Sequence, residues 1–427
     1  MSITISKVDL DALVESAVQN NPEEKLPDFL RINGEQISSE LNIVNALNLH
    51  FSTIGTKLAR SIENNNNVTF ASYLNNPPNI NFGFEQVSVE YVENVIDKLQ
   101  SKNSSGDDGV STKLIKYLKD LISRPLTLLI NQGLREGCFP DVLKTARVKS
   151  LFKKGDKHDP NNYRPISILP SVSKIFEKVM HKQIVNFFQT NNLFYESQYG
   201  FRANHSTELA VLELVDRLGK SMDAGGIPLS IFIDLSKAFD CLNHEILLDK
   251  LAYYGFCESS LRMMKSYLSN RNQYVKASGF SSNLENISIG VPQGSILGPL
   301  LFLIYMNDLA RATDHFHMIN FADDTALIST LQSSNNLEIQ QTETELSKVS
   351  SWLEANKMLI NVGKTKAMVF HTPRKSVPKP VIKLKGDNIE IVDRFPYLGI
   401  ILDKHLSWHE HVSSAAAKIS KNDWSLE

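Results

Sequence analysis

The sequence predicts an α+β fold, and three observations support this class. β-Prone runs and helical periodicities alternate irregularly along the 427 residues, several apolar runs are paired across short turns, and no internal repeat is evident. Apolar runs paired across short turns are typical of β-hairpins. A doubly wound parallel sheet would instead require strands and helices in regular alternation.

Composition and cysteine usage narrow the class of protein. With 42% apolar and 22% charged residues the chain has the make-up of a globular protein, and its length allows two to four domains. No apolar run is long enough to span a membrane, and the polar N-terminus lacks the pattern of a signal peptide. The three cysteines show neither disulfide nor metal-ligand spacing. We therefore expect an intracellular protein that works away from membranes.

Charge is distributed unevenly along the chain. The formal net charge of −2 argues against a nucleic-acid partner, because phosphate-binding proteins are usually basic. Residues 1–100, however, hold 6 Lys and Arg against 13 Asp and Glu, whereas residues 141–205 hold 11 against 5. The basic stretch is where we expect a phosphate backbone to bind.

Apolar periodicity and terminal signals predict mostly helices in the first 222 residues. A helical region over 1–63 contains an amphipathic stretch at 41–62, and Asn- and Pro-rich linkers follow at 64–67 and 75–79. Further helices are expected over 87–99 with Ser88 as N-cap, 113–118, 121–136 ended by Gly137, 173–190 with Ser173 as N-cap, and 206–222 opened by Ser206 or Thr207. Two strands, over 148–152 and 162–168, form a hairpin in which Pro165 favours an edge position.

Short strands mix with helices in the rest of the chain. An apolar run over 228–235 predicts a buried strand, and a long apolar period predicts a helix over 336–357. The remaining helices are expected over 243–254, 300–309 and from about Trp408, and the remaining strands over 273–277, 287–289, 367–371, 382–384 and 389–392.

Two acids lie between two apolar β-prone runs at residues 318–328 (MINFADDTALI). Read as strand, tight turn and strand, this segment places Asp323 and Asp324 at the tip of a hairpin. Adjacent carboxylates repel each other unless a cation neutralises them, so the pair indicates a metal site. A solvated turn is the alternative that this pattern leaves open.

A third acid, Asp234, ends the apolar strand that begins with the run at 229–233. An acid in that position is costly unless it binds a cation, is paired, or caps the next helix, and the capping role is the alternative here. One strand-end carboxylate and one hairpin carboxylate are the minimum for two Mg²⁺ ions about 3.5–4 Å apart. Because adjacent strand residues point to opposite faces, Asp323 and Asp324 cannot face Asp234 equally, and we favour Asp323 as the main ligand.

A Gly-rich segment at 290–299 (GVPQGSILGP) precedes an apolar helix. Glycines let a backbone approach a ligand closely, and a helix N-terminus favours anions. The segment is therefore a candidate loop for binding an anionic ligand, although an ordinary strand-to-helix turn would show the same pattern.

Three runs, in this order, resemble motifs A, B and C of reverse transcriptases: 232–240 (FIDLSKAFD), 290–295 (GVPQGS) and 321–324 (FADD). The likeness is closest to the polymerases of non-LTR (LINE-type) retrotransposons and covers roughly residues 100–415. Supporting runs lie at 162–167 (NYRPIS), 173–178 (SKIFEK), 198–202 (QYGFR) with 205–207 (HST), 361–366 (NVGKTK) and 395–400 (FPYLGI).

This resemblance implies a right-hand polymerase fold with fingers and a palm, whose antiparallel sheet packs on helices. It implies an RNA-directed DNA polymerase that joins dNTPs to a DNA primer on an RNA template, using two Mg²⁺ ions for which Mn²⁺ can substitute. The implied metal ligands are Asp234, Asp323, Asp324 and the Leu235 carbonyl. The implied nucleotide contacts are Phe239 as a gate against the 2′-hydroxyl, Gln293, Gly294, Arg164, one of Lys153 and Lys154, and one of Lys364 and Lys366 as the proton donor to pyrophosphate.

Several of these assignments have a plainer alternative. Phe239 would also suit an apolar core, and Lys153 and Lys154 would suit a solvated turn. Arg202 is assigned to the template side or to a structural role, as are Asp240 and His244.

The resemblance also predicts how the chain is divided. We expect a helical and linker segment at 1–100, fingers at 101–205, a palm with part of the fingers at 206–400, and the start of a thumb at 401–427. The family's upstream endonuclease domain is not recognisable, its Ser-Gly-Pro-Asp-Gly run is SGDDG at 105–109, and the thumb is short. We therefore expect a truncated copy of such an element, acting in the nucleus or cytoplasm as a ribonucleoprotein. The sequence does not specify protein partners.

Three rival functions are compatible with parts of the pattern. A nucleic-acid-binding remnant would keep the fold without synthesis. An RNA-copying RNA polymerase also places acids on a hairpin, but Phe239 argues against it. A phosphodiester-cleaving two-metal enzyme would carry an additional His or Glu beside the acids, and these motifs do not.

Overall fold

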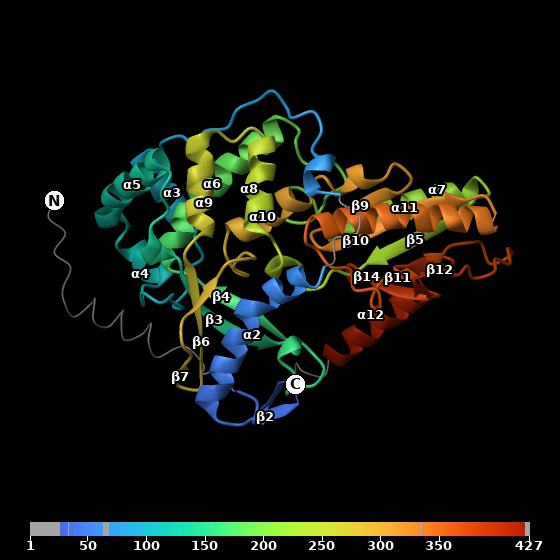
Figure 1. The fold of residues 1–427 in the computed structure, drawn as a ribbon, viewed down its shortest axis with the longest axis horizontal. Coiled ribbons are helices and arrows are strands. Elements are labelled where there is room, and N and C mark those ends of the chain that lie inside the picture. Colours follow the sequence, from blue (N-terminus) through green and yellow to red (C-terminus); the bar gives the residue numbers. More distant parts are fainter. Residues whose placement is uncertain (1–25, 33, 63–67, 334, 423–427) are drawn as a thin grey trace. The chain divides into compact units, whose positions relative to one another are not determined.

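The elements of the chain fall into two compact units (Figure 1). The computed structural model describes residues 26–32, 34–62, 68–333 and 335–422. The first unit takes its described residues from Met1–Ser61, Asn76–Leu193 and Phe239–Tyr305, and the second from Ile62–Asn75, Phe194–Ala238 and Met306–Glu427. Each unit therefore combines segments that are distant in the sequence.

The second unit is built on a six-stranded sheet with the order β12-β13-β11-β5-β10-β9. Every pairing is antiparallel except that of β11 with β13. The strands are β5 (Ile227–Ile233), β9 (His317–Phe321), β10 (Asp324–Leu331), β11 (Lys366–Val369), β12 (Ile382–Leu384) and β13 (Asp387–Ile391). A mainly antiparallel sheet combined with helices agrees with the α+β class.

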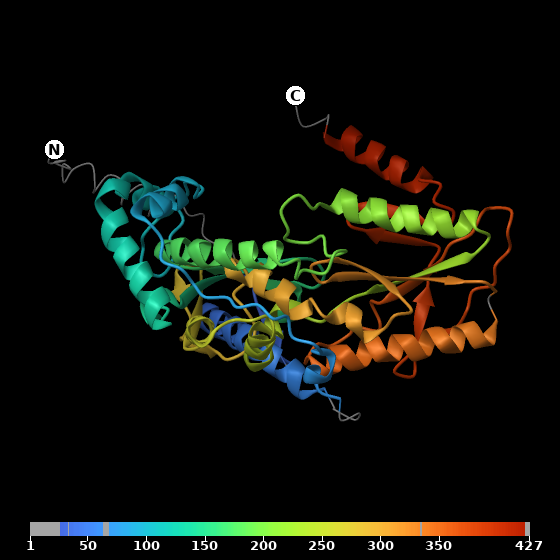
Figure 2. The ribbon, with the colours of Figure 1, turned by 90° about the horizontal axis from the view of Figure 1, so that it is seen from above.

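Helices α7 (Thr207–Asp223) and α11 (Asn336–Ala355) lie on opposite faces of this sheet (Figure 2). All seven residues of β5 are buried, as expected for a central strand that is covered on both faces. On the α7 face, Leu214 and Leu218 belong to the same apolar cluster as Phe232 of β5. Of the two predicted caps, Ser206 and Thr207, it is Ser206 that caps α7, because its hydroxyl accepts a hydrogen bond from the Leu209 amide.

A hairpin and a helix complete the C-terminal part of the second unit. Strands β14 (Arg394–Tyr397) and β15 (Ile400–Asp403) pair across Leu398 and Gly399, and α12 (His409–Asn422) follows. Both turn residues have positive φ, at 44° and 90°, as a type I′ turn requires. This hairpin was not predicted, because Pro396 interrupts the run and a proline weakens a strand pattern. Two 3-10 turns, η1 (Phe70–Tyr73) and η5 (Leu309–Ala312), also belong to this unit.

The first unit contains a smaller sheet with the order β4-β3-β6-β7, and β8 also pairs with β6. Its strands are β3 (Thr145–Phe152), β4 (Tyr163–Ile168), β6 (Arg271–Ala277), β7 (Phe280–Ser281) and β8 (Glu285–Ile287). Strand β4 lies at the edge, which confirms the position predicted from Pro165. Helix α2 (Glu40–Arg60) packs on this sheet, and its buried Asn48 donates to the backbone carbonyls of Gln273 and Asn283.

The other helices of the first unit follow the predicted pattern with some exceptions. They are α3 (Val89–Asp97), α4 (Thr112–Tyr117), α5 (Lys119–Glu136), α6 (Ser171–Thr190), α8 (His244–Tyr253), α9 (Glu258–Leu268) and α10 (Leu297–Met306), with 3-10 turns η2 (Asp141–Leu143), η3 (Pro160–Asn162) and η4 (Ala238–Asp240). Ser88 caps α3, and Gly137, with φ of 70°, ends α5, both as predicted. Helix α9 was not predicted.

Two local predictions were wrong. Ser173 does not cap α6, because the helix already begins at Ser171 after Pro170, and the Ser173 hydroxyl instead donates to Glu177. The predicted helix over 1–63 is interrupted by the hairpin β1 (Leu30–Ile32) and β2 (Glu35–Ile37), whose turn contains Gly34 at φ of 87°. Residues 1–25 of that prediction lie outside the described residues. No helix in the described segments is both long and apolar enough to cross a bilayer.

The packing of α7 on the sheet generates a stability prediction. Leu214 has no exposed surface, so Leu214→Ala should lower the free energy of unfolding by about 2–5 kcal/mol through lost burial and a residual cavity. The matched control is Leu212→Ala on the same helix, where the side chain is 63% exposed and the change should stay within about 0.5 kcal/mol. Urea denaturation followed by circular dichroism measures both, and equal effects would contradict the packing described.

Candidate active site

The acidic hairpin predicted from the sequence is present. Strands β9 and β10 pair with Phe321 opposite Asp324, and Ala322 and Asp323 form the two-residue turn between them. Ala322 has φ of 57°, the positive value that a type II′ turn takes at its first central position. The turn therefore holds two consecutive carboxylates at the tip of a strongly paired hairpin.

Pairing of β5 with β10 brings Asp234 to the same place. The antiparallel register sets Ile233 opposite Thr325, so one further step along each strand sets Asp234 beside Asp324. Both acids line a single cavity of about 90 Å³. Residues 90 positions apart in the chain thus contribute to one site.

Asp323, which the sequence favoured as the main metal ligand, does not lie where Asp234 and Asp324 lie. It is a central residue of the turn and is not among the residues that line the cavity with Asp234. The choice between the two acids stays a prediction, and the shared cavity favours Asp324.

Leu235 was predicted to offer its carbonyl to the metal. It pairs with Ile360 in an isolated bridge whose two hydrogen bonds use the Ser236 amide and the Asp234 carbonyl, not the Leu235 carbonyl.

The structure separates the two lysines that the sequence left as alternatives. Lys364 lines the cavity with Asp234 and Asp324. The ammonium group of Lys366 instead donates to the Gly363 carbonyl at 2.7 Å and forms an ion pair with Glu390 at 2.8 Å. These contacts favour Lys364 as the lysine that can reach a bound phosphate.

The residues around the cavity fit a magnesium site. The described residues contain no cluster of three or more His, Cys, Asp or Glu side chains that could hold a metal together. Mg²⁺ needs only one or two carboxylates, because water and substrate phosphate oxygens complete its octahedron. Asp234 and Asp324 supply that number of carboxylates from one cavity wall.

Inside the first unit, the predicted nucleotide loop is held by three neighbouring segments. The Gln293 carbonyl accepts from the Ser167 amide at 2.7 Å, and its side-chain amide donates to Asp240 at 2.8 Å. Gly294 has φ of 124°, and a Cβ there would lie 2.5 Å from the Ser167 carbonyl oxygen, so only glycine fits. Burial lowers the pKa of His244, whose neutral ring donates to the Gly290 carbonyl at 2.7 Å. These contacts favour the structural alternative for Asp240 and His244.

A buried acid that sequence reasoning did not assign supports the same loop. Glu177 of α6 is fully buried, and its carboxylate accepts from the amides of Ile296 and Leu297 at 2.6 and 3.2 Å, at the start of α10. Burial raises the pKa of Glu177, whereas the nearby Arg271 and these hydrogen bonds lower it. The signal available in the sequence was an acid on the apolar face of a strong helix, which requires buried partners.

The remaining nucleotide-side candidates also lie in the first unit. The half-buried ring of Phe239 stacks on Phe302, with centroids 4.6 Å apart, so one face of the ring is already packed. Lys153, Lys154 and Arg164 lie at the loop end of the β3–β4 hairpin with exposed side chains. They could contact a phosphate group there, and their roles stay predictions.

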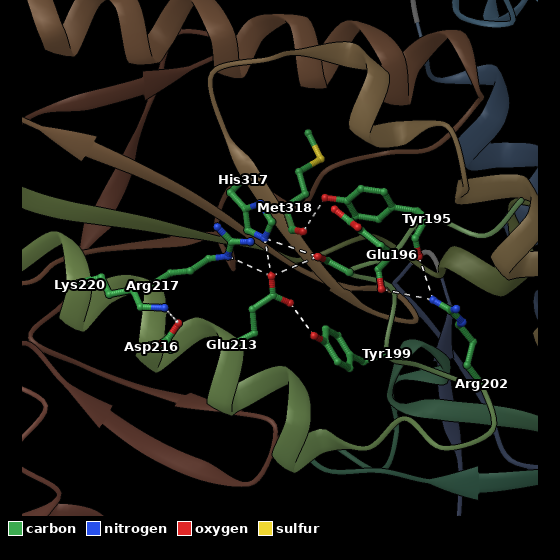
Figure 3. Close-up of polar contacts among 11 residues, drawn as sticks. Tyr195, Glu196, Tyr199, Arg202, Glu213, Asp216, Arg217, Lys220, His317 and Met318 are labelled. Carbon is green, nitrogen blue, oxygen red and sulfur yellow. Dashed lines mark hydrogen bonds and ion pairs between the residues drawn. The ribbon is translucent and has the colours of Figure 1, made fainter. Parts of the chain in front are cut away.

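Arg202 contacts neighbouring backbone carbonyls and an aromatic ring. Its guanidinium donates to the backbone carbonyl of Tyr195 at 2.9 Å (Figure 3). It also donates to the Gln198 carbonyl at 3.0 Å and lies over the Phe194 ring. Burial lowers the pKa of Arg202. These contacts favour the structural alternative over a template contact.

A second network in Figure 3 ties α7 to the strand that leads into the acidic turn. The Glu213 carboxylate accepts from Tyr199 at 2.6 Å, from His317 at 2.7 Å and from Arg217 at 2.9 Å. Burial would raise the pKa of Glu213, but these hydrogen bonds hold it below its ordinary value. Burial and the bond to Glu213 raise the pKa of Tyr199 to about 12.

A mainly antiparallel sheet that gathers two carboxylates and a lysine around one cavity suits metal-dependent phosphoryl transfer. A model of the family described as reverse transcriptase (RNA-dependent DNA polymerase) matches residues 153–402. The chain belongs to this family, which implies the palm and fingers of a polymerase fold and general dependence on a divalent metal.

Curated relatives agree with this family. The chain is 29% identical over 368 residues to the RNA-directed DNA polymerase from mobile element jockey of Drosophila melanogaster, covering 82% of this chain. It is 30% identical over 362 residues to the probable RNA-directed DNA polymerase from transposon BS of the same species, covering 81% of this chain. The chain spans 39% of the length of each of these relatives. The matches confirm the resemblance to polymerases of non-LTR retrotransposons.

The Glu213 network predicts a specific dependence of stability on pH. Because the folded-state pKa of Glu213 is lowered, its stabilising effect is present above the ordinary pKa of 4.5 and is lost as the pH falls through the lowered value. Glu213→Gln should therefore lose thermal stability near neutral pH and show a flatter acid limb. Melting temperatures between about pH 7 and pH 3 measure this. Asp216→Asn, which removes an exposed pair with Lys220 on the same helix, should leave the curve nearly unchanged.

Proposed function

We propose that the chain is an RNA-directed DNA polymerase of a non-LTR retrotransposon, which adds deoxynucleotides to a primer 3′-hydroxyl. The observation that carries the proposal is the cavity shared by Asp234, Asp324 and Lys364. When bound, two Mg²⁺ ions supply the positive charge that activates the 3′-hydroxyl and neutralises the pyrophosphate, and Mn²⁺ can substitute. RNA template, DNA primer and dNTPs are the proposed partners, and the site of action is the nucleus or cytoplasm.

Each candidate residue has a role that follows from its chemistry. Asp234 and Asp324, with Asp323 beside them, bind the metal ions through carboxylate oxygens. Lys364 donates a proton to the leaving pyrophosphate, which is the role of a general acid. Preorganised charge of this kind stabilises a transition state because the groups need no reorientation during the reaction.

The other candidate residues bind the nucleotide in this proposal. Arg164, with Lys153 or Lys154, pairs with triphosphate oxygens, for which the planar guanidinium is well suited. Gln293 and Gly294 line the nucleotide, and Phe239 excludes a 2′-hydroxyl. In this proposal residues 101–205 act as fingers, 206–400 as palm with part of the fingers, and 401–427 as the start of the thumb.

Primer extension tests the proposed activity. Asp234→Asn and Asp324→Asn should each lower the rate of dNTP incorporation on an RNA template by about 100-fold or more, because each removes charge that the metal site requires. Removal of divalent metal with EDTA should abolish incorporation. Asp216→Asn, which changes an exposed acid of α7, is the matched control and should retain the wild-type rate.

Two outcomes would contradict this proposal. A wild-type chain that binds primer–template but extends no primer would instead support a nucleic-acid-binding remnant. Primer extension by both Asp variants would show that the reaction does not depend on this cavity.

The gate assigned to Phe239 predicts a change in sugar selectivity. Phe239→Ala should raise ribonucleotide incorporation relative to deoxynucleotide incorporation by about 10-fold or more, because the space for a 2′-hydroxyl is opened. Single-nucleotide addition with matched dNTP and rNTP pairs measures the ratio, with Phe302→Leu as a control for loss of the stacked neighbour. Efficient ribonucleotide use by the wild type would favour an RNA polymerase instead.

A further inference from the structure

The strand that leads into the acidic turn lies at an edge of its sheet. Strand β9 pairs with β10 on one side only. Its other side is covered by residues 197–199, because the Asn320 amide donates to the Ser197 carbonyl at 2.9 Å and the Tyr199 amide donates to the Asn320 carbonyl at 2.7 Å. These bonds form a short parallel bridge between Gln198 and Asn320. Residues 197–200, which form a brace beside the hairpin, therefore cover the edge of β9 at Asn320.

The side chain of Gln198 extends this contact into the turn itself. Gln198 is 3% exposed, and its side-chain carbonyl oxygen accepts from the Ala322 amide at 3.1 Å and from the Gly200 amide at 2.9 Å. One oxygen therefore joins the brace to the first residue of the turn. An acceptor in that place fixes the direction of the Ala322 amide and hence of the peptide planes that carry the two acids.

The turn needs such support because its backbone is unfavourable for its sequence. Ala322 adopts φ of 57°, a region that residues with a Cβ rarely occupy. Gly200 packs directly on it, since a Cβ at Gly200 would lie 2.2 Å from the Ala322 nitrogen. A strained conformation persists only where surrounding contacts determine it, and here those contacts come from residues 198–200.

The brace is itself anchored to α7 and to β9. Tyr199 donates to Glu213, and the same carboxylate accepts from His317 at the start of β9 (Figure 3). Arg202 holds the carbonyls of Tyr195 and Gln198 on the other side. Gln198 is therefore part of a rigid support and not of a free loop.

We propose that Gln198 is a positioning residue for the metal site: its side-chain oxygen, by holding the Ala322 amide, sets the direction of the Asp323 and Asp324 carboxylates and so their affinity for a divalent cation. This inference rests on the proposed function, in which those acids bind the metal. Residues that orient metal ligands from behind commonly change metal affinity by about 10- to 100-fold when they are replaced.

Mn²⁺ binding to the full chain, measured by electron paramagnetic resonance, tests the proposal without requiring activity. Gln198→Met keeps the length of the side chain but removes the acceptor, and it should weaken Mn²⁺ binding by about 10-fold or more. Gln198→Glu keeps an oxygen at the same reach and should bind Mn²⁺ much better than the Met variant. In primer extension, the Met variant should need correspondingly more Mg²⁺ for half-maximal rate while recovering most of its rate at saturating Mg²⁺.

A matched control separates this role from a general loss of stability. Gln183 also makes two side-chain bonds to backbone, to the amide and carbonyl of Glu85 in the first unit. Gln183→Met should cost comparable thermal stability without changing Mn²⁺ binding. If Gln198→Met does not fold, Gln198→Asn, whose shorter amide cannot reach Ala322, serves in its place.

The outcomes decide between the two proposals. Wild-type Mn²⁺ affinity in a folded Gln198→Met or Gln198→Asn variant would overturn the role of Gln198 and leave the proposed function intact. Mn²⁺ binding that depends on Asp324 and on Gln198, in a chain that extends no primer, would support the positioning role and overturn the polymerase activity. A chain that binds no Mn²⁺ would overturn both.

Discussion

The antiparallel pairing of β5 with β10 is the constraint on which the candidate site depends. It sets Ile233 opposite Thr325 and thereby places Asp234 next to Asp324. Because side chains alternate between faces along a strand, a slip of one residue would turn every side chain of β5 to the other face. The close packing of Phe232 among Leu214 and Leu218 on the α7 face opposes such a slip, so side-chain fit fixes the position of the acids.

Placing several carboxylates together is costly, and the surrounding structure offsets the cost. Asp234 and Asp324 lie at strand ends and line one cavity together with Lys364. The strained alanine turn is supported by a segment that also covers the exposed edge of β9. One short run of the chain therefore closes a sheet edge and steadies a functional turn.

Local signals predicted much of this fold. The acidic hairpin, the caps at Ser88 and Ser206 and the end of α5 at Gly137 all depend on residues close together in sequence, and all are present. Predictions failed where contacts between distant segments override the local sequence pattern. Ser173 had the chemistry of a cap, yet its hydroxyl bonds Glu177 because the helix begins earlier, and α9 was missed altogether. Buried supports such as Glu177 and Gln198 gave no local sign of their partners, which lie more than 100 residues away.

The sequence by itself determined the chemical groups, their order along the chain and the type of most elements, because these depend on residue identity and on periods of a few residues. Only the tertiary structure decided which groups meet. It placed Asp324 on the cavity wall with Asp234, put Lys364 there while Lys366 pairs with Glu390, and turned Arg202 toward backbone carbonyls. The physical reason is that strand register and side-chain direction are set by packing between distant segments, about which a local pattern carries no information.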